Sequence, residues 1–156
     1  MKVIMNDEAF AKKGFYISTD QALLNFEMIY KFLDQDSYWS KGIPPEKLRA
    51  ALSNSLCFGV YHNQEQVGLA RVITDKAIFA YLCDVFILPA YRGNGLSKWL
   101  IQTVRAHPDL QGLRRWLLGT ADAHGLYAQF GFTVITKPER WMEIITPHAI
   151  KNNKEE

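Results

Sequence analysis

The sequence has few of the features that mark specialised classes of protein. Its 156 residues include only two cysteines, Cys57 and Cys83. Both lie in apolar runs, and neither has the Cys/His spacing of a zinc site, so we expect two buried reduced thiols, no disulfide and no metal. No apolar run approaches the roughly 18 residues of a membrane span, and the first residues carry no signal-peptide core. These absences favour a cytoplasmic protein with no membrane partner.

Charge of one sign is also scarce. The formal net charge is +2, and the lysines and arginines are scattered along the chain, so nucleic acid is not an expected partner. Hydrophobic residues make up 48% and charged residues 22%, which is the ordinary balance of a soluble globular protein. No repeat, linker or low-complexity tract divides the chain. We therefore expect one domain over residues 1–150 and a polar tail over 151–156.

The spacing of apolar residues predicts both helices and strands. Helices are expected at 21–33, 45–54, 95–106 and 121–130. Strands are expected at 15–20, 56–62, 66–74, 77–88, 115–119, 132–136 and 141–145. This order implies an α+β fold of three layers, with a mostly antiparallel central sheet and helices on both faces. Only the strands that flank the helix at 95–106 are expected to be parallel, joined by a right-handed crossover.

The most informative segment is the turn that leads into the helix at 95–106. It reads Arg92-Gly93-Asn94-Gly95-Leu96-Ser97 and follows an apolar strand. Gly93 and Gly95 lack a Cβ, so the backbone can bend sharply and come close to an anion. The first N–H groups of a helix have no partner inside it and lie at the positive end of its dipole. The pattern predicts a pyrophosphate site on main-chain amides; the alternative is an ordinary strand-to-helix turn.

Two motifs, in this order, resemble those of the GNAT superfamily of N-acetyltransferases. The acetyl-CoA motif of that family, Q/R-x-x-G-x-G/A, matches residues 92–97, with Ser97 in place of the final Gly or Ala. The second signature, Tyr-x-x-x-Gly-Phe at the end of a helix, matches residues 127–132. The resemblance covers nearly the whole chain and implies the GNAT fold, acetyl-CoA as the donor and transfer of its acetyl group. A homodimer is a further expectation from what relatives do.

The resemblance also implies where the donor would bind. The pyrophosphate would lie on the amides of Gly93 to Ser97, with Lys98 adding positive charge. The pantetheine arm would pair, as an added strand does, with the backbone of the preceding strand, where the sheet splays apart in this family. The expected cofactor-binding residues are Val85, Phe86, Ile87, Arg92, Gly93, Asn94, Gly95, Leu96, Ser97 and Lys98.

The tyrosine of the second signature is the expected general acid. A phenol with a pKa near 10 holds its proton at neutral pH and can donate it to a departing thiolate. The alternative is that Tyr127 only packs and hydrogen-bonds the cofactor. His124 lies three residues earlier, on the same side of the helix. It is either a proton relay that titrates near neutrality or an ordinary surface histidine.

Asp84 is the only charged residue in the run 77–88. A carboxylate there is costly unless it is paired or faces a cleft. Strict alternation places Asp84 on the face of Leu82 and Phe86. Val85 would then lie on the opposite face, unless a bulge re-aims the carboxylate. Asp84 is therefore either the base that acts on the amine or a buried, paired structural residue.

The acceptor site is expected at Tyr38, Trp39 and Tyr81, because aromatic side chains with polar groups often form the walls of pockets. The alternative for Trp39 is that it anchors its loop in the core. Together these features predict transfer of an acetyl group from acetyl-CoA to a primary amine of a small-molecule acceptor by direct attack. Two alternatives remain open: a non-catalytic acyl-CoA sensor or regulatory module, and an N-acetyltransferase of proteins or peptides.

Overall fold

The computed structural model describes residues 4–5 and 7–147, with side chains described for 7–147. The polar tail expected at 151–156 lies outside the described residues. The described strands are β1 (Ile4–Met5), β2 (Phe15–Ser18), β3 (Leu56–His62), β4 (Glu65–Thr74), β5 (Phe79–Ile87) and β6 (Arg115–Leu118). The described α-helices are α1 (Glu8–Ala11), α2 (Phe26–Lys31), α3 (Pro45–Ser53), α4 (Leu96–Ala106) and α5 (His124–Ala128).

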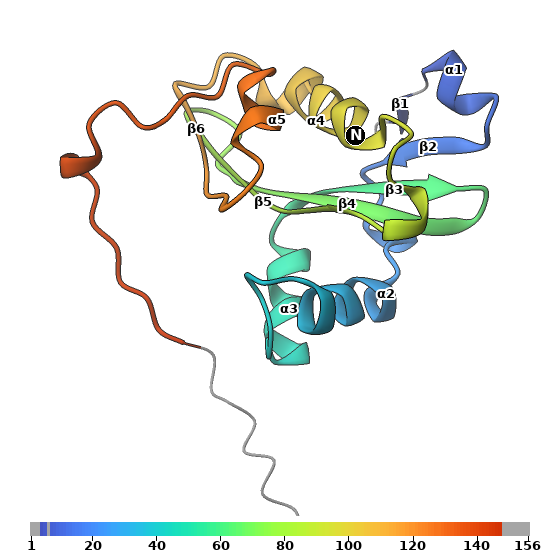
Figure 1. The fold of residues 1–156 in the computed structure, drawn as a ribbon, viewed down its shortest axis with the longest axis horizontal. Coiled ribbons are helices and arrows are strands. Elements are labelled where there is room, and N and C mark those ends of the chain that lie inside the picture. The colour runs from blue at the N-terminus through green and yellow to red at the C-terminus, as the bar shows by residue number, and fades with distance from the viewer. Residues whose placement is uncertain (1–3, 6, 148–156) are drawn as a thin grey trace, which may run out of the picture.

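The strands form one sheet in the order β1-β2-β3-β4-β5-β6. Neighbouring strands are antiparallel except β5 and β6, which run parallel on either side of α4 in the sequence. Helices α4 and α5 cover one face of the sheet, and α2 and α3 cover the other (Figure 1). The expected three-layer fold, with a single parallel pair around the glycine-turn helix, is therefore confirmed in the described part of the chain.

Each face of the sheet carries its own hydrophobic cluster. The first lies under α4, whose Leu100 and Val104 are fully buried against the strands. The second lies under α2 and α3, whose Ile29 and Leu48 are fully buried near Phe86 of β5. The strand β5 contributes to both clusters, because parallel and central strands are covered on both faces. Side chains of β5 can therefore be directed to either helical layer.

The helix expected at 21–33 is broken in the structure. Residues 21–23 form a short 3₁₀ turn, and α2 begins only at Phe26. Asn25 separates the 3₁₀ turn from α2. Its side chain accepts a hydrogen bond from the Met28 N–H and so caps the start of α2. Gln66 of β4 accepts from the Asn25 N–H at 2.7 Å and fixes this break against the sheet. The helix expected at 121–130 is shorter too, because α5 spans only His124–Ala128.

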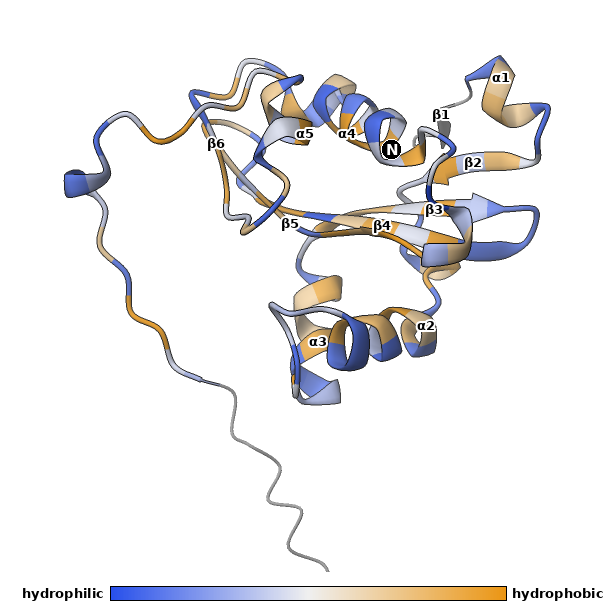
Figure 2. Cartoon of the chain, viewed as in Figure 1, coloured by the Kyte–Doolittle hydropathy of each residue, from blue (hydrophilic) through white to orange (hydrophobic). Residues whose placement is uncertain are grey.

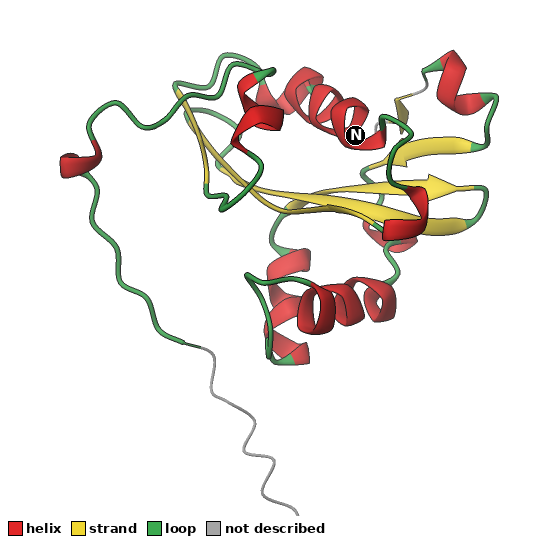
Figure 3. Cartoon of the chain, viewed as in Figure 1, coloured by secondary structure: helices red, strands yellow, loops and turns green. Residues whose placement is uncertain are grey.

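The two strands expected at 132–136 and 141–145 are not formed. Residues 133–147, which we call the C-terminal arm, form no strand and contain only a short 3₁₀ turn at Pro138–Arg140; the last described residues lead away from the sheet (Figures 1 and 3). The arm has the alternating pattern of a strand, but alternation specifies only an apolar face. A strand also needs a partner for its backbone groups, and within the described residues the arm has none. The strand prediction was therefore wrong for this chain on its own.

The structure also contains two short elements that periodicity did not predict. Strand β1 extends the sheet beside β2, and α1 places Phe10 in a stacked contact with Trp99 of α4 at 4.3 Å between ring centroids. No helix in the described ranges is long and apolar enough to cross a membrane.

Candidate active site

A bulge in β5 determines which way Asp84 points. Arg71 of β4 pairs with Cys83, but Leu69, two residues earlier, pairs with Phe86, so one extra residue is inserted in β5. Asp84 has φ of 50°, in the left-handed region that costs energy for residues other than glycine. The bulge turns its carboxylate towards α2 and α3. Leu82, which strict alternation places on the face of Asp84, packs instead in the cluster under α4 together with Val85, so strict alternation was wrong between Leu82 and Asp84.

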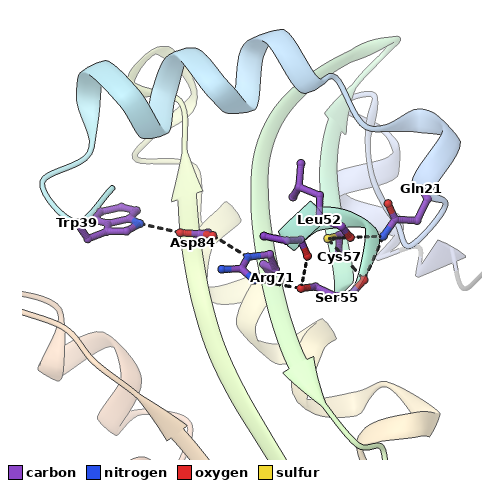
Figure 4. Close-up of polar contacts among 8 residues, drawn as sticks. Gln21, Trp39, Leu52, Ser55, Cys57, Arg71 and Asp84 are labelled. Atoms are coloured by element: carbon purple, nitrogen blue, oxygen red, sulfur yellow. Dashed lines mark hydrogen bonds and ion pairs between the residues drawn. The ribbon is translucent and has the colours of Figure 1, made fainter. Parts of the chain in front are cut away.

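The Asp84 carboxylate is held by side chains from two other segments (Figure 4). The indole Nε1–H of Trp39 donates to Oδ1 at 2.9 Å, and the Nε–H of Arg71 donates to Oδ2 at 2.7 Å. Arg71 also donates through Nη1 to the Ser55 hydroxyl at 3.1 Å. Burial lowers the pKa of the Arg71 guanidinium, but the charge of Asp84, together with Cys83, the hydrogen bond to Asp84 and Cys57, outweighs burial and raises that pKa. The buried carboxylate is thus both paired and rigidly oriented.

Asp84 lies at the wall of a cavity of about 410 Å³, a size suited to a small molecule. The lining comes from the loop after α2, from β5, from the loop after β6 and from α5. It comprises Tyr38, Trp39, Tyr81, Leu82, Cys83, Asp84, Val85, Gly119, Thr120, Ala121, Asp122, Ala123 and Tyr127. The hydroxyl of Tyr38 accepts from the Ala121 N–H at 3.0 Å. This bond joins the two loops on opposite sides of the cavity.

Burial raises the pKa of three other groups at the cavity, Tyr127, Cys83 and Tyr81. Tyr127 is 9% exposed, and burial raises the pKa of its phenol to about 12. Burial likewise raises the pKa of the Cys83 thiol to about 12, so it is not a thiolate nucleophile at neutral pH. Burial also raises the pKa of Tyr81. The cavity therefore combines two carboxylates, the paired Asp84 and the exposed Asp122, with phenol and thiol groups that can donate a proton.

The glycine turn lies at the other end of β5 and offers main-chain groups. Gly93 and Gly95 have φ of 84° and 80°, the left-handed conformation that favours glycine. Gly95 is the N-cap of α4, and no side chain caps the first turn. Arg92 donates through Nε to the Ile87 carbonyl at 2.9 Å, which ties the turn to the end of β5. A Cβ added at Gly93 would meet nothing within 4 Å, so the turn is open.

Among the described residues, no strand pairs with one edge of β5 between the cavity and the turn. Pairing with β6 ends at Leu82, whereas pairing with β4 continues to Ile87. The main chain at 83–87 therefore has a neighbouring strand on one side only. Phe86 and Ile87 bury their side chains in the two different clusters, so their main-chain groups are what this edge presents. Leu96 is buried too, while Lys98 on α4 is exposed.

The structure brings most of the expected catalytic and acceptor residues together and separates one. Tyr38, Trp39, Tyr81, Asp84 and Tyr127 all line the same cavity. His124 does not line it; this histidine is exposed and faces a second groove beside the arm. The roles of all these residues remain predictions. No cluster of His, Cys, Asp and Glu within the described ranges could hold a metal ion.

Sequence reasoning missed Arg71 and Ser55, and it placed Cys83 deeper than it lies. Cys83 is only partly buried because it faces the cavity. A signal for Arg71 was present: it is the only charged residue in the apolar run 67–73. A charge in such a strand needs an opposite charge nearby, and Asp84 has the same property. Two isolated opposite charges in adjacent strands would have predicted the pair.

Comparison with known proteins identifies the family. Residues 26–132 match the acetyltransferase (GNAT) family, which is well over half of the chain. The protein therefore belongs to the GNAT family of acetyltransferases, and the prediction from its two motifs is confirmed.

Individual relatives agree with this. A candidate acetyltransferase of Gibberella zeae is 35% identical over 148 residues, with 81% of this chain and 82% of that protein covered. A crystal structure of a candidate GNAT acetyltransferase from Xanthomonas campestris pv. campestris is 50% identical, with a TM-score of 0.85 over 88% of this chain and 96% of that one. A GNAT acetyltransferase of Elizabethkingia anophelis, solved with acetyl-CoA bound, shares the fold at 14% identity, with a TM-score of 0.59 and 86% and 89% coverage.

Proposed function

We propose that this GNAT acetyltransferase transfers the acetyl group of acetyl-CoA to a primary amine of a small molecule by direct attack. The observation that carries the proposal is the cavity at which a buried carboxylate, Asp84, and a buried phenol, Tyr127, meet. That cavity adjoins the free edge of β5, and the glycine turn follows the same strand. One strand therefore connects a site suited to a diphosphate with a site suited to proton transfer.

The residues at the donor end fit acetyl-CoA. The amides of 93–97 would hold the diphosphate, because the left-handed glycines and the uncapped start of α4 expose N–H groups. Lys98, exposed on the first turn of α4, would add a positive charge. The free main-chain edge at 85–87 would pair with the pantetheine arm. When bound, acetyl-CoA supplies an activated acyl group as a thioester.

Tyr127 is proposed as the general acid. Its raised pKa of about 12 keeps the phenol protonated throughout the neutral range. A protonated group in a buried cavity can donate to a developing thiolate. The same burial that raises the pKa also excludes water from competing for that proton.

Asp84 is proposed as the base that accepts a proton from the acceptor ammonium, directly or through one water molecule. Each of its oxygens accepts one hydrogen bond, Oδ1 from Trp39 and Oδ2 from Arg71. A carboxylate offers about four lone-pair sites, so it can still accept from an amine. The strained φ of 50° supports this role, because strained residues cluster at functional sites.

The cavity favours a small acceptor over a protein substrate. Its volume is about 410 Å³, and the hydrogen bond from Ala121 to Tyr38 joins the loops across it. Aromatic rings at Tyr38, Trp39 and Tyr127 would contact an apolar or cationic part of the acceptor.

A thiol-release assay with a broad panel of small primary amines tests the proposal. We expect turnover with at least one amine and a fall in kcat of about a hundredfold in Tyr127→Phe, as for loss of a general acid. Tyr16→Phe, on β2 away from the cavity, is the matched control and should turn over normally. Tight binding of acetyl-CoA with no thiol release for any amine would contradict catalysis and favour the sensor alternative.

A further inference from the structure

The cavity of about 410 Å³ has a second carboxylate, Asp122, which the proposed reaction does not use. Asp122 is exposed and lies in the loop between β6 and α5, which contains a hydrophilic stretch (Figure 2). Asp84 is 8% exposed and lies on β5. The two carboxylates therefore come from different segments, Asp84 at the buried wall of the cavity and Asp122 at its solvent-exposed side.

The charged side chains at the cavity are of one sign. Among the described residues that line it, Asp84 and Asp122 are acidic and none is Lys, Arg or His. Arg71 pairs with Asp84 from the side away from Trp39 and does not line the cavity (Figure 4). None of the ion pairs between described side chains involves Asp122. A ligand in this cavity therefore meets a negative charge at Asp122 that the chain itself leaves unpaired.

Asp122 lies close to two tyrosines of the same cavity. The pKa of Tyr127 is raised chiefly by burial and further by Tyr38 and Asp122, and one charge acts on the pKa of another group only at short range. The N–H of Ala121, the residue before Asp122, donates to the Tyr38 hydroxyl at 3.0 Å. That hydrogen bond fixes the loop that carries Asp122 beside the aromatic wall.

The proposed reaction removes the charge from the nitrogen that reacts. The new C–N bond forms as the C–S bond of the thioester breaks. One proton of the acceptor ammonium goes to Asp84, and a second reaches the departing thiolate by way of Tyr127. The reacting nitrogen therefore has no charge left with which to hold the acceptor, whereas a second ammonium group on the same molecule keeps its charge throughout. Asp122 is the unpaired charge that such a group would meet, and the rings of Tyr38 and Tyr127 also attract a cation.

We propose that the acceptor is a small dicationic amine, which places its reacting amine at Asp84 and its second ammonium at Asp122. This inference rests on the proposed function and narrows its substrate class. Asp122 selects the acceptor and takes no part in proton transfer. The second ammonium is unchanged by the reaction, so the product carries one acetyl group and one positive charge.

Three amines of equal chain length test the charge at the far end of the acceptor. The probes 1,4-diaminobutane, 1-aminobutane and 4-aminobutanoate end in an ammonium, a methyl group and a carboxylate. In the wild type, kcat/KM is expected to be roughly fivefold higher for the diamine than for the monoamine, after correction for its two equivalent amines, as for one partly exposed ion pair. The amino acid is expected to be the poorest. The differences should lie in KM, because Asp122 binds the acceptor equally before and during the reaction.

Asp122→Asn removes the charge and nearly preserves the shape of the side chain. It is expected to give the diamine and the monoamine equal kcat/KM, to improve the amino acid and to leave the monoamine unchanged. Asp109→Asn is the matched control. Asp109 is also exposed, but it follows α4, pairs with Lys76 and lines neither the cavity nor the groove beside the arm. This control should keep the order of the three amines.

Calorimetric titration of 1,4-diaminobutane into the protein with excess coenzyme A separates the inference from the proposed reaction. Binding that weakens roughly fivefold in Asp122→Asn supports the inference, even if no amine releases thiol, and that second result would contradict the reaction alone. Turnover of all three amines at similar kcat/KM, a preference for the monoamine or the amino acid, or an equal effect of Asp122→Asn on all three would overturn the inference and leave the reaction standing. A diamine that neither binds nor reacts would overturn the inference as well.

Discussion

The bulge within β5 and the glycine turn that follows β5 have different roles, and they use different groups of the chain. At the glycine turn, consecutive residues present main-chain amides, and the side chains there mainly hold the turn in place, as Arg92 does. At the bulge, the groups that matter are side chains, and they come from the loop after α2, from β4, from β5 and from α5. The comparison suggests a division of roles. Main-chain groups of one short segment are enough to bind a donor that a whole family shares, whereas the reaction with a particular acceptor needs side chains from several separate segments.

Asp84→Asn should have the largest effect and should act at the bulge alone. We expect kcat to fall by a factor of roughly 10² to 10⁴ if the carboxylate is the base. The free energy of unfolding should fall by about 3 kcal/mol, because Arg71 would keep a buried charge without its partner. Steady-state thiol release and urea unfolding measure the two effects.

The double variant Arg71→Met with Asp84→Leu separates the base from a structural role. Replacing both members of a buried ion pair by apolar residues is often neutral for stability. We therefore expect the unfolding free energy to recover while turnover stays lost. A double variant that turns over like the wild type would show that Asp84 serves only the fold.

Gly93→Ala and Gly95→Ala should affect the other end of β5. Gly93 has φ of 84° and Gly95 has φ of 80°. An added Cβ in this left-handed conformation costs about 1–2 kcal/mol, and we expect it to weaken acetyl-CoA binding roughly tenfold. Gly112→Ala is the matched control, since it has φ of 70° and open space around its Cβ but lies after α4. Calorimetry should show weaker binding in the first two variants only; equal loss in all three would point to general instability.

The smallest effect concerns pH and belongs to the bulge, where Cys83 lines the cavity. Burial raises the pKa of Cys57 to about 11 and that of Cys83 to about 12, from 9.0. Above pH 9 the unfolded thiols ionise while the folded ones keep their protons, so the free energy of unfolding should fall as the pH rises towards these values. Cys83→Ala should reduce this slope, measured by urea unfolding across the alkaline range. An unchanged slope in that variant would mean that Cys83 is not buried as described.

The same contrast explains what the sequence could predict. The donor end follows from six consecutive residues, 92–97, because two left-handed glycines and a helix start are local features. The order of elements from β2 to α5 follows from periodicity for a similar reason. At the bulge, alternation wrongly places Asp84 on the same face as Leu82. The extra residue becomes visible only when β5 is paired with β4.

The arm shows a second limit. Its alternating residues predicted strands at 132–136 and 141–145, yet residues 133–147 form no strand and are mostly exposed. A hydrophobic pattern indicates an apolar face, but it does not indicate what covers that face. Arg71 was missed for a related reason, since its partner lies in another strand. Periodicity within one segment does not indicate which other segment will lie beside it, so the contacts between segments at this site could not be predicted in this way.

Calorimetric titration of acetyl-CoA into the wild type and into Asp84→Asn tests the central claim most directly. The account predicts that both bind acetyl-CoA with the same affinity, because the main-chain turn at 93–97 and not the bulge holds the donor, while only the wild type transfers the acetyl group. A wild type that binds neither acetyl-CoA nor coenzyme A would contradict the account. So would a folded Asp84→Asn that has lost donor binding.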